Sequence, residues 1–405
     1  MASWQPYLCD TVTGQIETPI DLPAFSWSVS VSDSSLATLK EKGLGDETIS
    51  GLTVPWTSLP GDTPSARRRS ISTDRTSVAL LWKDTDDGSL GRPILMGSIG
   101  VRQDKALDTS FTLNSPMAML ADRYVIREGK YGTGPNGTSP DVIALTGLSY
   151  RGIASEVGYL CTSCKPGGEL PIDWTYRGEK GSKARQYDCW DVQNLSCKDV
   201  LTKISNVIGG PDIQFRPYLT QDGAHIRYRF CAGSDSDVYL WQDRVHYLSY
   251  GRDGGIISDL TVDHLGPVHR VYASGAGQDK TQKTVMVEDL TMLTGNDPWI
   301  LHEATYSDSD TSDRALLREH ALSYLKANDR PLIQITCTIN AHEHTPDGLP
   351  KLALGTFWPG ELFDLAIDDY APLPDGIYRT RLMQMSGDQT GIVKLTFDAM
   401  ADPTI

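Results

Sequence analysis

Hydrophobic and polar residues alternate most regularly near the C-terminal end of the chain. Ile333, Ile335, Cys337 and Ile339 alternate with polar residues, which is the period of two expected for a strand with one buried face. Turn residues then separate three further segments of this kind. The pattern predicts four short antiparallel strands, which would form a small barrel or sandwich, at 333–340, 361–367, 377–384 and 392–397.

The N-terminal part of the chain shows a comparable pattern. It predicts a second β module of similar size, with strands at 25–31, 78–82, 91–101 and 107–113. Residues 32–75 are rich in Ser, Thr, Gly, Pro and Asp, so we expect a long exposed functional loop or contact arm there. The two β modules share no residue-level repeat, and any kinship between them would be structural.

The region between the two modules shows both helical and strand patterns. Capping residues and apolar spacing predict helices at 115–123, at 150–161, from Ser196 to the Gly209-Gly210 pair, and from Thr311 or Ser312 to about Ala327. Further strands are expected at 215–218, 226–231, 256–262, 268–273 and 284–287. The predicted fold class is therefore mainly β with an α+β middle region.

The length of 405 residues predicts a multidomain protein, because a domain usually takes about 100–200 residues. We expect an N-terminal β-barrel-like domain at 1–127 that includes the long loop 32–75, and an α+β domain at 128–255. A third region at 256–329 would contain strands and a helix, and the C-terminal β-barrel strands would occupy 330–405.

Composition narrows the class of protein. No apolar run reaches the roughly 20 residues that span a bilayer, and residues 1–10 lack a signal-sequence pattern, so we expect synthesis and folding in a cytoplasm. Seven scattered cysteines favour reduced thiols over a disulfide framework. A formal net charge of −15 argues against tight binding to a nucleic-acid backbone.

One glycine motif and one cysteine motif match known ligand sites only in part. Gly132, Gly134 and Gly137 have the spacing of a dinucleotide-binding loop, but Pro135 interrupts it and no clear strand precedes it. Cys161 and Cys164 form a C-x-x-C motif that Cys189 and Cys197 would complete as a zinc site. The gap between the last two cysteines is unusual for zinc, and packing at a helix end is the favoured interpretation.

Two further motifs concern metals. Asp308, Asp310 and Glu319 occupy positions of a calcium loop, but Asp313 stands where that loop needs glycine, so the acidic residues favour a helix N-terminus instead. His342 and His344 give the His-x-His of some cell-wall peptidases. The His-x-x-x-Asp that those enzymes also need does not occur in the sequence, and an exposed hairpin loop is the favoured interpretation.

A hydrolase with residues scattered along the sequence remains open, because such sites leave no local motif. Three tryptophans, Trp174, Trp190 and Trp241, can either stack on sugars or pack in cores and interfaces.

With two terminal β modules in place, the chain resembles the hub proteins, also called minor tail proteins, at the tip of long-tailed bacteriophages. The resemblance spans nearly the whole chain and is a pattern of strands and turns without a catalytic signature. It rests on residues 27–31, 91–97, 115–117, 358–363, 376–379 and 393–396.

In that family two barrel domains per subunit, joined by α+β domains, form a ring in which three chains imitate sixfold symmetry. The resemblance implies a structural homotrimer at the virion tail tip, made in the host cytoplasm, with neither enzymatic activity nor a cofactor. Its partners would be the distal tail protein, the tape-measure protein and other tail-tip proteins or fibres, and DNA would pass through it without specific binding.

The chain ends at Ile405, just after the expected barrel, so we expect no C-terminal fibre or wall-degrading domain. Two alternatives are a tail-associated peptidoglycan hydrolase and a glycan-binding tip protein.

Two basic segments of this acidic chain contain candidate subunit-interface residues. The first segment, at 67–69, has an equally simple interpretation as a solvated loop. The two segments contain Arg67, Arg68 and Arg69, and Arg177 and Arg185. Arginine in a DNA conduit would bind the passing phosphates. We therefore expect a neutral or acidic channel wall, with both basic segments outside it.

Overall fold

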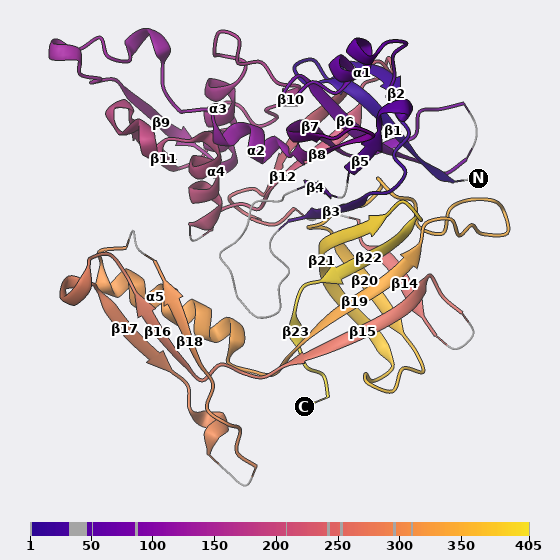
Figure 1. Ribbon diagram of the computed structural model, residues 1–405. Helices are drawn as coiled ribbons and strands as arrows, with labels where there is room; N and C mark the ends of the chain where they lie inside the picture. Colours follow the sequence, from indigo (N-terminus) through magenta and orange to yellow (C-terminus); the bar gives the residue numbers. More distant parts are fainter. Residues whose placement is uncertain are drawn as a thin grey trace.

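The computed structural model describes residues 2–31, 47–50, 52–85, 88–207, 209–240, 244–251, 254–294, 297–308 and 311–404. In this part of the chain strands outnumber helices, and several sheets surround an α+β middle region, which confirms the predicted mainly β class. Figure 1 shows the N-terminal sheet at upper right, the middle region at upper left, the C-terminal sheet below the N-terminal one, and a projecting arm at lower left. No helix of the described residues is long and apolar enough to cross a membrane.

The N-terminal sheet is buried on both of its faces. It contains β1 (Ser3–Asp10), β2 (Ile16–Pro19), β5 (Leu52–Pro55), β6 (Thr76–Lys83), β7 (Arg92–Asp104) and β8 (Asp108–Asn114), in the order β2-β1-β6-β7-β8-β5. Along β6, Val78 and Leu80 enter one hydrophobic core while Ala79 and Leu81 enter another. This explains why the strand reads as a continuous apolar run instead of an alternating one.

The predicted long loop at 32–75 is only partly a loop. Residues 32–46 lie outside the described part of the chain, and the following residues form regular elements: β4 (Glu47–Ser50), β5, the 3-10 helix η1 (Trp56–Ser58) and α1 (Pro64–Ser70). Helix α1 begins because the Thr63 side chain accepts a hydrogen bond from Ala66 N–H and Pro64 stands at the first helical position. The Ser, Thr and Pro residues that indicated a loop are in part helix-capping residues.

The strand predicted at 25–31 does not belong to the N-terminal sheet. It forms β3 (Ser26–Ser30), which pairs with β4 and with β21 (Gly376–Asp388) of the C-terminal sheet. Period-two alternation correctly indicated a strand, but it carries no information about a partner more than 300 residues away in the chain.

The C-terminal sheet contains the four strands predicted from the alternation: β19 (Leu332–Asn340), β20 (Leu362–Ile367), β21 and β22 (Ile392–Phe397). With β14 (His246–Tyr250) and β15 (Ile257–Leu265) they run in the order β14-β20-β21-β22-β19-β15, and β23 (Met400–Ala401) pairs with β19. The path curls back so that its two end strands meet where Ile256 N–H donates to Ser249 O at 3.0 Å. No strand ladder joins them in the described residues, so the predicted barrel-like sheet is open at this seam.

Five strands of each sheet are connected in the same order. In the N-terminal sheet β6, β7 and β8 form a meander, the preceding strand β5 returns beside β8, and β1 lies beside β6. In the C-terminal sheet β20, β21 and β22 form the meander, β19 returns beside β22, and β14 lies beside β20. Both are Greek-key arrangements; they differ in that β1 is antiparallel to β6 while β14 is parallel to β20.

The middle region packs against the second face of the N-terminal sheet. Its helices are α2 (Pro116–Ala121), α3 (Tyr150–Cys161) and α4 (Cys197–Asn206), with 3-10 turns η2 (Glu128–Lys130), η3 (Pro135–Gly137) and η4 (Cys189–Asn194). Its strands are β9 (Val142–Leu148), β10 (Ile172–Asp173), β11 (Lys183–Asp188), β12 (Ile213–Leu219) and β13 (Ile226–Ala232). Helix α3 needs glycine at position 158, because a Cβ atom there would lie 2.1 Å from the Trp174 ring.

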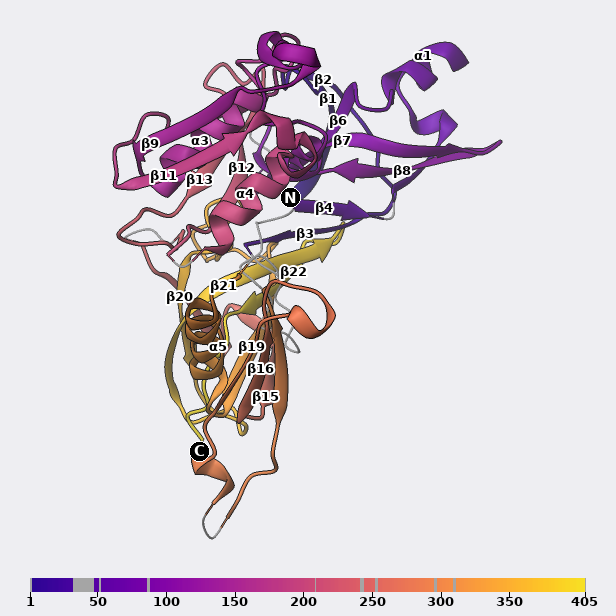
Figure 2. The same cartoon turned by 90° about the vertical axis from the view of Figure 1, so that its left-hand side faces the viewer.

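The arm is a small α+β unit that projects from the C-terminal sheet (Figures 1 and 2). It comprises β16 (Arg270–Ser274), η5 (Asp279–Thr281), β17 (Thr284–Glu288), η6 (Thr291–Leu293), β18 (Glu303–Ser307) and α5 (Arg314–Asn328). Helix α5 covers one face of the sheet and builds a separate core with it. Its N-cap is Asp313, which accepts from Ala315 N–H; the predicted caps Thr311 and Ser312 precede it, and Thr311 Oγ1 donates to Asp308 instead.

Candidate functional site

A buried ion pair joins the middle region to the C-terminal sheet. Arg216 of β12 and Glu361, just before β20, are 8% and 3% exposed. Arg216 Nη1 donates to Glu361 Oε1 at 2.8 Å, and the other carboxylate oxygen lies 3.0 Å from Nε2 of the buried His246. Arg216 Nε donates to Gln214 Oε1 at 2.7 Å. The buried charges are thus mutually satisfied, and removing one partner would leave another charge unpaired away from water.

A second ion pair links the same two layers. Arg381 of β21 donates to Asp212, the residue before β12, at 2.5 Å, and to Asp398 at 3.2 Å. Its guanidinium carbon lies 4.4 Å from the centre of the Tyr239 ring. We call these two clusters together the charged joint: Arg216, Glu361, His246, Arg381, Asp212 and Asp398.

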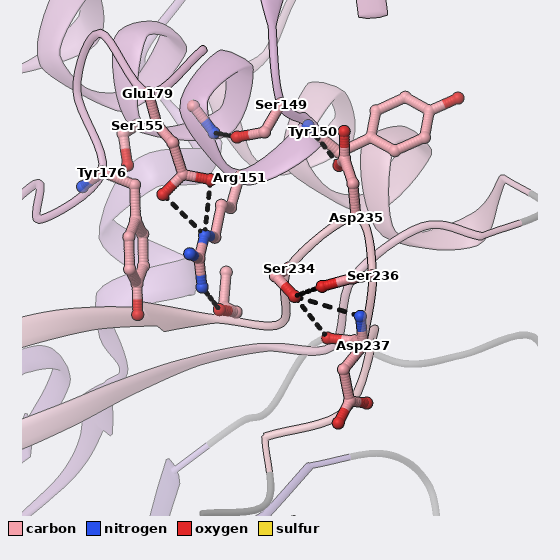
Figure 3. A network of polar contacts seen from close by, with 12 residues as sticks. Ser149, Tyr150, Arg151, Ser155, Tyr176, Glu179, Ser234, Asp235, Ser236 and Asp237 are labelled. Carbon is pink, nitrogen blue, oxygen red and sulfur yellow. Dashed lines mark hydrogen bonds and ion pairs between the residues drawn. The ribbon is translucent and has the colours of Figure 1, made fainter. Parts of the chain in front are cut away.

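The chain crosses from the middle region to the C-terminal sheet through the loop after β13, and Figure 3 shows how α3 holds that loop. Tyr150 N–H, at the N-terminus of α3, donates to Asp235 Oδ1 at 2.9 Å. A carboxylate is favourable at this end of a helix dipole. The loop is closed on itself where Ser234 accepts from Asp237 N–H at 3.0 Å. The loop that connects the middle region to the C-terminal sheet is therefore held by a hydrogen bond to α3.

A charge pair braces the same helix. Arg151 Nε lies 2.9 Å from both carboxylate oxygens of Glu179, and its Nη1 donates to Ala232 O at the end of β13. Hydrogen bonds from Arg151 lower the pKa of Glu179, against the opposing effect of burial. Arg151 also lies 4.3 Å from the centre of the Tyr176 ring. These contacts connect α3, the segment between β10 and β11, and β13.

The first set of predicted interface residues lies on α1, at upper right in Figure 2. Arg68 and Arg69 are exposed, and Arg67 is half-buried and donates to Gly61 O at 3.0 Å. Arg102 of β7 reaches the same corner and donates to Arg68 O at 3.1 Å. The structure thus gathers a basic corner at this end of the N-terminal sheet.

The second set lies at the opposite side of the molecule, around α3 and β11 (Figures 1 and 2). Arg177 is exposed, lies 3.3 Å from the Tyr159 ring centre and pairs with Glu156 at 3.3 Å. Arg185 lies 5.1 Å from the centre of the Tyr150 ring. The two basic segments are therefore separate surfaces.

The motifs with metal spacing form no metal site among the described residues, where no group of three or more His, Cys, Asp or Glu side chains is placed to hold an ion. Cys161, Cys189 and Cys197 are buried and Cys164 is exposed. A hydrogen bond with Cys161 and burial raise the pKa of Cys197. Asp308 accepts from Thr311 and lies 2.8 Å from His320 Nδ1; Asp310, the second residue of the calcium spacing, lies outside the described residues.

The remaining motifs also have structural partners. His342 Nε2 lies 2.9 Å from Thr390 O and its ring packs on Trp82, while His344 Nδ1 lies 2.7 Å from His342 O. The glycine loop is followed by strand β9 and not by the helix that a dinucleotide site requires.

The three tryptophans differ in their surroundings. Trp174 is buried and donates to Thr162 at 2.8 Å, whereas Trp190 is exposed. Trp241 lies outside the described residues.

The charged joint was not predicted from the sequence. Its signal was present in β12, where Gln214 and Arg216 interrupt an apolar segment and are nonetheless buried. A charged side chain among consecutive buried strand residues requires a buried partner. The identity of that partner, 145 residues away in the case of Glu361, was not accessible from the pattern.

No protein-family model matches the sequence, and no curated protein matches it. Among solved structures, the chain is similar to the 43 kDa tail protein of prophage MuSo2 from Shewanella oneidensis, with a TM-score of 0.50 and 8% identity over 98% of each chain. It is also similar to the tail protein from Neisseria meningitidis MC58, with a TM-score of 0.48 and 13% identity over 98% of this chain and 96% of that one. At such low identities the match to the MuSo2 protein shows a shared fold.

Proposed function

We propose that the chain is a structural subunit of a phage tail tip, where three copies form the hub. The observation that carries the proposal is the end-to-end agreement in fold with the MuSo2 tail protein, which leaves almost no part of either chain unmatched. The family resemblance of the sequence points to the same role.

The repeated Greek-key topology supports a trimer. Each chain contributes two sheets in which five strands share one order of connection, so three copies would place six similar units around one axis. Closed rings with cyclic symmetry are a common form of protein assembly. Such a ring would fit a sixfold tail tube and distal tail protein on one side and a threefold tip on the other.

The charged joint supports a role in which each subunit keeps a rigid internal arrangement. Six units form a regular ring only if the two sheets of each chain keep a fixed relative orientation. Buried and mutually satisfied ion pairs hold two layers in one arrangement, because sliding would leave charges unpaired. In the proposed hub the joint holds the C-terminal sheet against the middle region, which itself packs on the N-terminal sheet.

The proposed ring encloses a channel for the tape-measure protein and DNA. The acidic chain would give the wall a neutral or acidic character, and the two basic surfaces at α1 and β11 would face neighbouring subunits, the distal tail protein or other tip proteins. Their separation on opposite sides of the molecule is compatible with contacts to two different neighbours.

The competing function of peptidoglycan hydrolase has little support in the described residues. The two histidines that motivated it, His342 and His344, bond to backbone carbonyl oxygens, and burial contributes to raised pKa values of the Cys189 and Cys197 thiols. We therefore keep the structural proposal.

Two experiments test the proposed tail-tip function: mass spectrometry of purified particles, and electron microscopy of particles assembled without the chain. We expect the chain in the virion, and tails that lack a tip or fail to assemble in its absence. Normal infectious particles assembled without the chain would overturn the proposal.

A further inference from the structure

A surface groove lies between β11, η4 and α4, and the hub function does not account for it. Its volume is about 250 Å³. The lining residues combine an apolar floor with a polar rim: Arg185, Gln186, Tyr187, Asp188, Trp190, Asp191, Asn194, Leu195, Val200, Lys203 and Ile204. This combination is typical of small-ligand sites, where polar groups orient a ligand over apolar surface.

Trp190 forms one side of the groove and is unusually open to solvent. It is 68% exposed, although tryptophan is highly buried on average. Among the described residues no aromatic ring pairs with its indole, whereas Trp4 and Trp174 each have ring partners. An indole ring in this position offers a flat apolar platform to a ligand that enters the groove.

Planar polar side chains stand beside the indole in two hydrogen-bonded pairs. Gln186 Nε2 donates to Asp188 Oδ1 at 3.0 Å, and Asn194 Nδ2 donates to Asp191 Oδ1 at 2.8 Å. An ionised carboxylate accepts through two oxygens and an amide both donates and accepts. Each pair is therefore held in place by its internal bond and still has groups able to bond a ligand.

The charges of the lining cancel. Asp188 and Asp191 are balanced by Arg185 and Lys203, so the groove has no net charge to attract a phosphate or a polyanion. The floor is formed by the buried side chains of Leu195, Val200 and Ile204. A suitable ligand is thus neutral, has one apolar face, and carries several hydroxyl groups at its edge.

We propose that this groove binds a neutral saccharide. A pyranose ring has an apolar face of C–H groups that stacks on an aromatic ring, and its equatorial hydroxyl groups lie at the edge of that face. The face would lie on Trp190, while the hydroxyl groups donate to Asp188 or Asp191 and accept from the amide groups of Gln186 or Asn194. Arg185 also belongs to the second basic surface, so the inference concerns the unassembled subunit, in which one chain supplies every lining residue of the groove.

The test uses the full-length chain and four neutral tetrasaccharides: cellotetraose, maltotetraose, mannotetraose and chitotetraose. Tryptophan fluorescence titration and saturation-transfer NMR report binding. The wild-type chain should bind at least one probe, and Trp190→Ala should weaken that binding at least about tenfold while Trp190→Phe retains part of it. Asn194→Ala should weaken it as well, by removal of a rim amide.

The matched control is Ile300→Ala, since Ile300 is 72% exposed and lies between η6 and β18 of the arm, whereas the groove is lined by residues of the middle region. It should bind the probe like the wild type. Absence of binding to all four probes, or equal binding by Trp190→Ala, would overturn the proposal. If the probes do not bind and Trp190→Ala instead changes the mass of the assembly, the groove is a protein contact and the saccharide proposal is wrong.

Discussion

Glu361 is the residue on which the charged joint depends most, because one carboxylate serves both Arg216 and His246. Glu361→Gln keeps the size of the side chain and removes its charge, so Arg216 remains buried without a counterion. We expect a loss of about 3–5 kcal/mol in the free energy of unfolding, the usual effect of removing one partner of a buried ion pair. The measurement is the midpoint of thermal unfolding by circular dichroism.

The matched control is Glu343→Gln. Glu343 pairs with Lys351 at 2.8 Å, but both side chains are partly exposed, and exposed pairs contribute only about 0–1 kcal/mol. Equal effects of the two substitutions would contradict the role assigned to the joint.

The cysteines allow a second test at the scale of single residues. Cys164 is exposed and Cys231 is half-buried, while the other five thiols are buried, and burial raises the pKa of Cys9 and Cys337 to about 12. Because the thiolate is the reactive form, a maleimide should label Cys164 first in the native chain. Peptide mass spectrometry after brief labelling identifies the site, and rapid labelling of Cys9 or Cys337 would contradict the described core.

His269 gives the arm a pH dependence. It is 1% exposed, and His302 N–H donates to its Nδ1 at 3.1 Å. Burial and the neighbouring His302 lower the pKa of His269, opposed by Asp289. The unfolded chain therefore binds the proton more readily than the folded chain does. Stability is complete above the unfolded pKa of 6.5 and is lost as the pH falls through the lower folded value.

His269→Asn isolates this effect, since the amide oxygen can still accept from His302 N–H but does not titrate. We expect hydrogen exchange in β16–β18 to accelerate between pH 7 and pH 5 in the wild type, after correction for intrinsic exchange rates, and less so in the variant. The same acceleration in both chains would mean that other groups control the arm.

Among the elements, strands and helices were predicted correctly where their own residues carry a clear alternation, apolar spacing or capping residue. The alternation of 333–340 predicted β19, and Ser115 and Ser196 cap α2 and α4 as expected from sequence. Strands β1 and β9 were missed because their residues do not alternate clearly between buried and exposed positions. The partner of β3 was also missed, because strand pairing depends on residues far away in the chain.

The position of β3 between two sheets leads to a prediction for Trp27. This residue is buried, and its ring lies 5.3 Å from that of Trp4, which in turn lies 5.1 Å from that of Trp82. Trp27→Ala should therefore destabilise the contact between the sheets by about 3–5 kcal/mol, as expected for a large buried aromatic side chain. Thermal unfolding and limited proteolysis measure the effect.

Trp190→Ala is the control for Trp27→Ala, because exposed substitutions usually change stability by about 0.5 kcal/mol or less. If Trp27→Ala were equally harmless, β3 would not link the two sheets.

At the scale of the whole molecule, the sequence predicted the mainly β class and the presence of two β modules. It did not predict that one core runs from the N-terminal sheet into the C-terminal sheet, as Leu80 and Ile335 show by belonging to the same cluster. It also did not predict the charged joint, whose partners come together only in the folded chain. Periodicity reveals which side of a strand is buried, but not which other surface buries it.

Cryo-electron microscopy of the tip of purified particles would show directly whether three copies of the chain form a ring there. We expect three copies around the tail axis, with both sheets of each copy contributing to six similar units. We also expect α1 and β11 to lie away from a neutral or acidic channel wall. A different copy number, absence of the chain from the tip, or a ring of arginines facing the axis would show that the proposed hub is wrong.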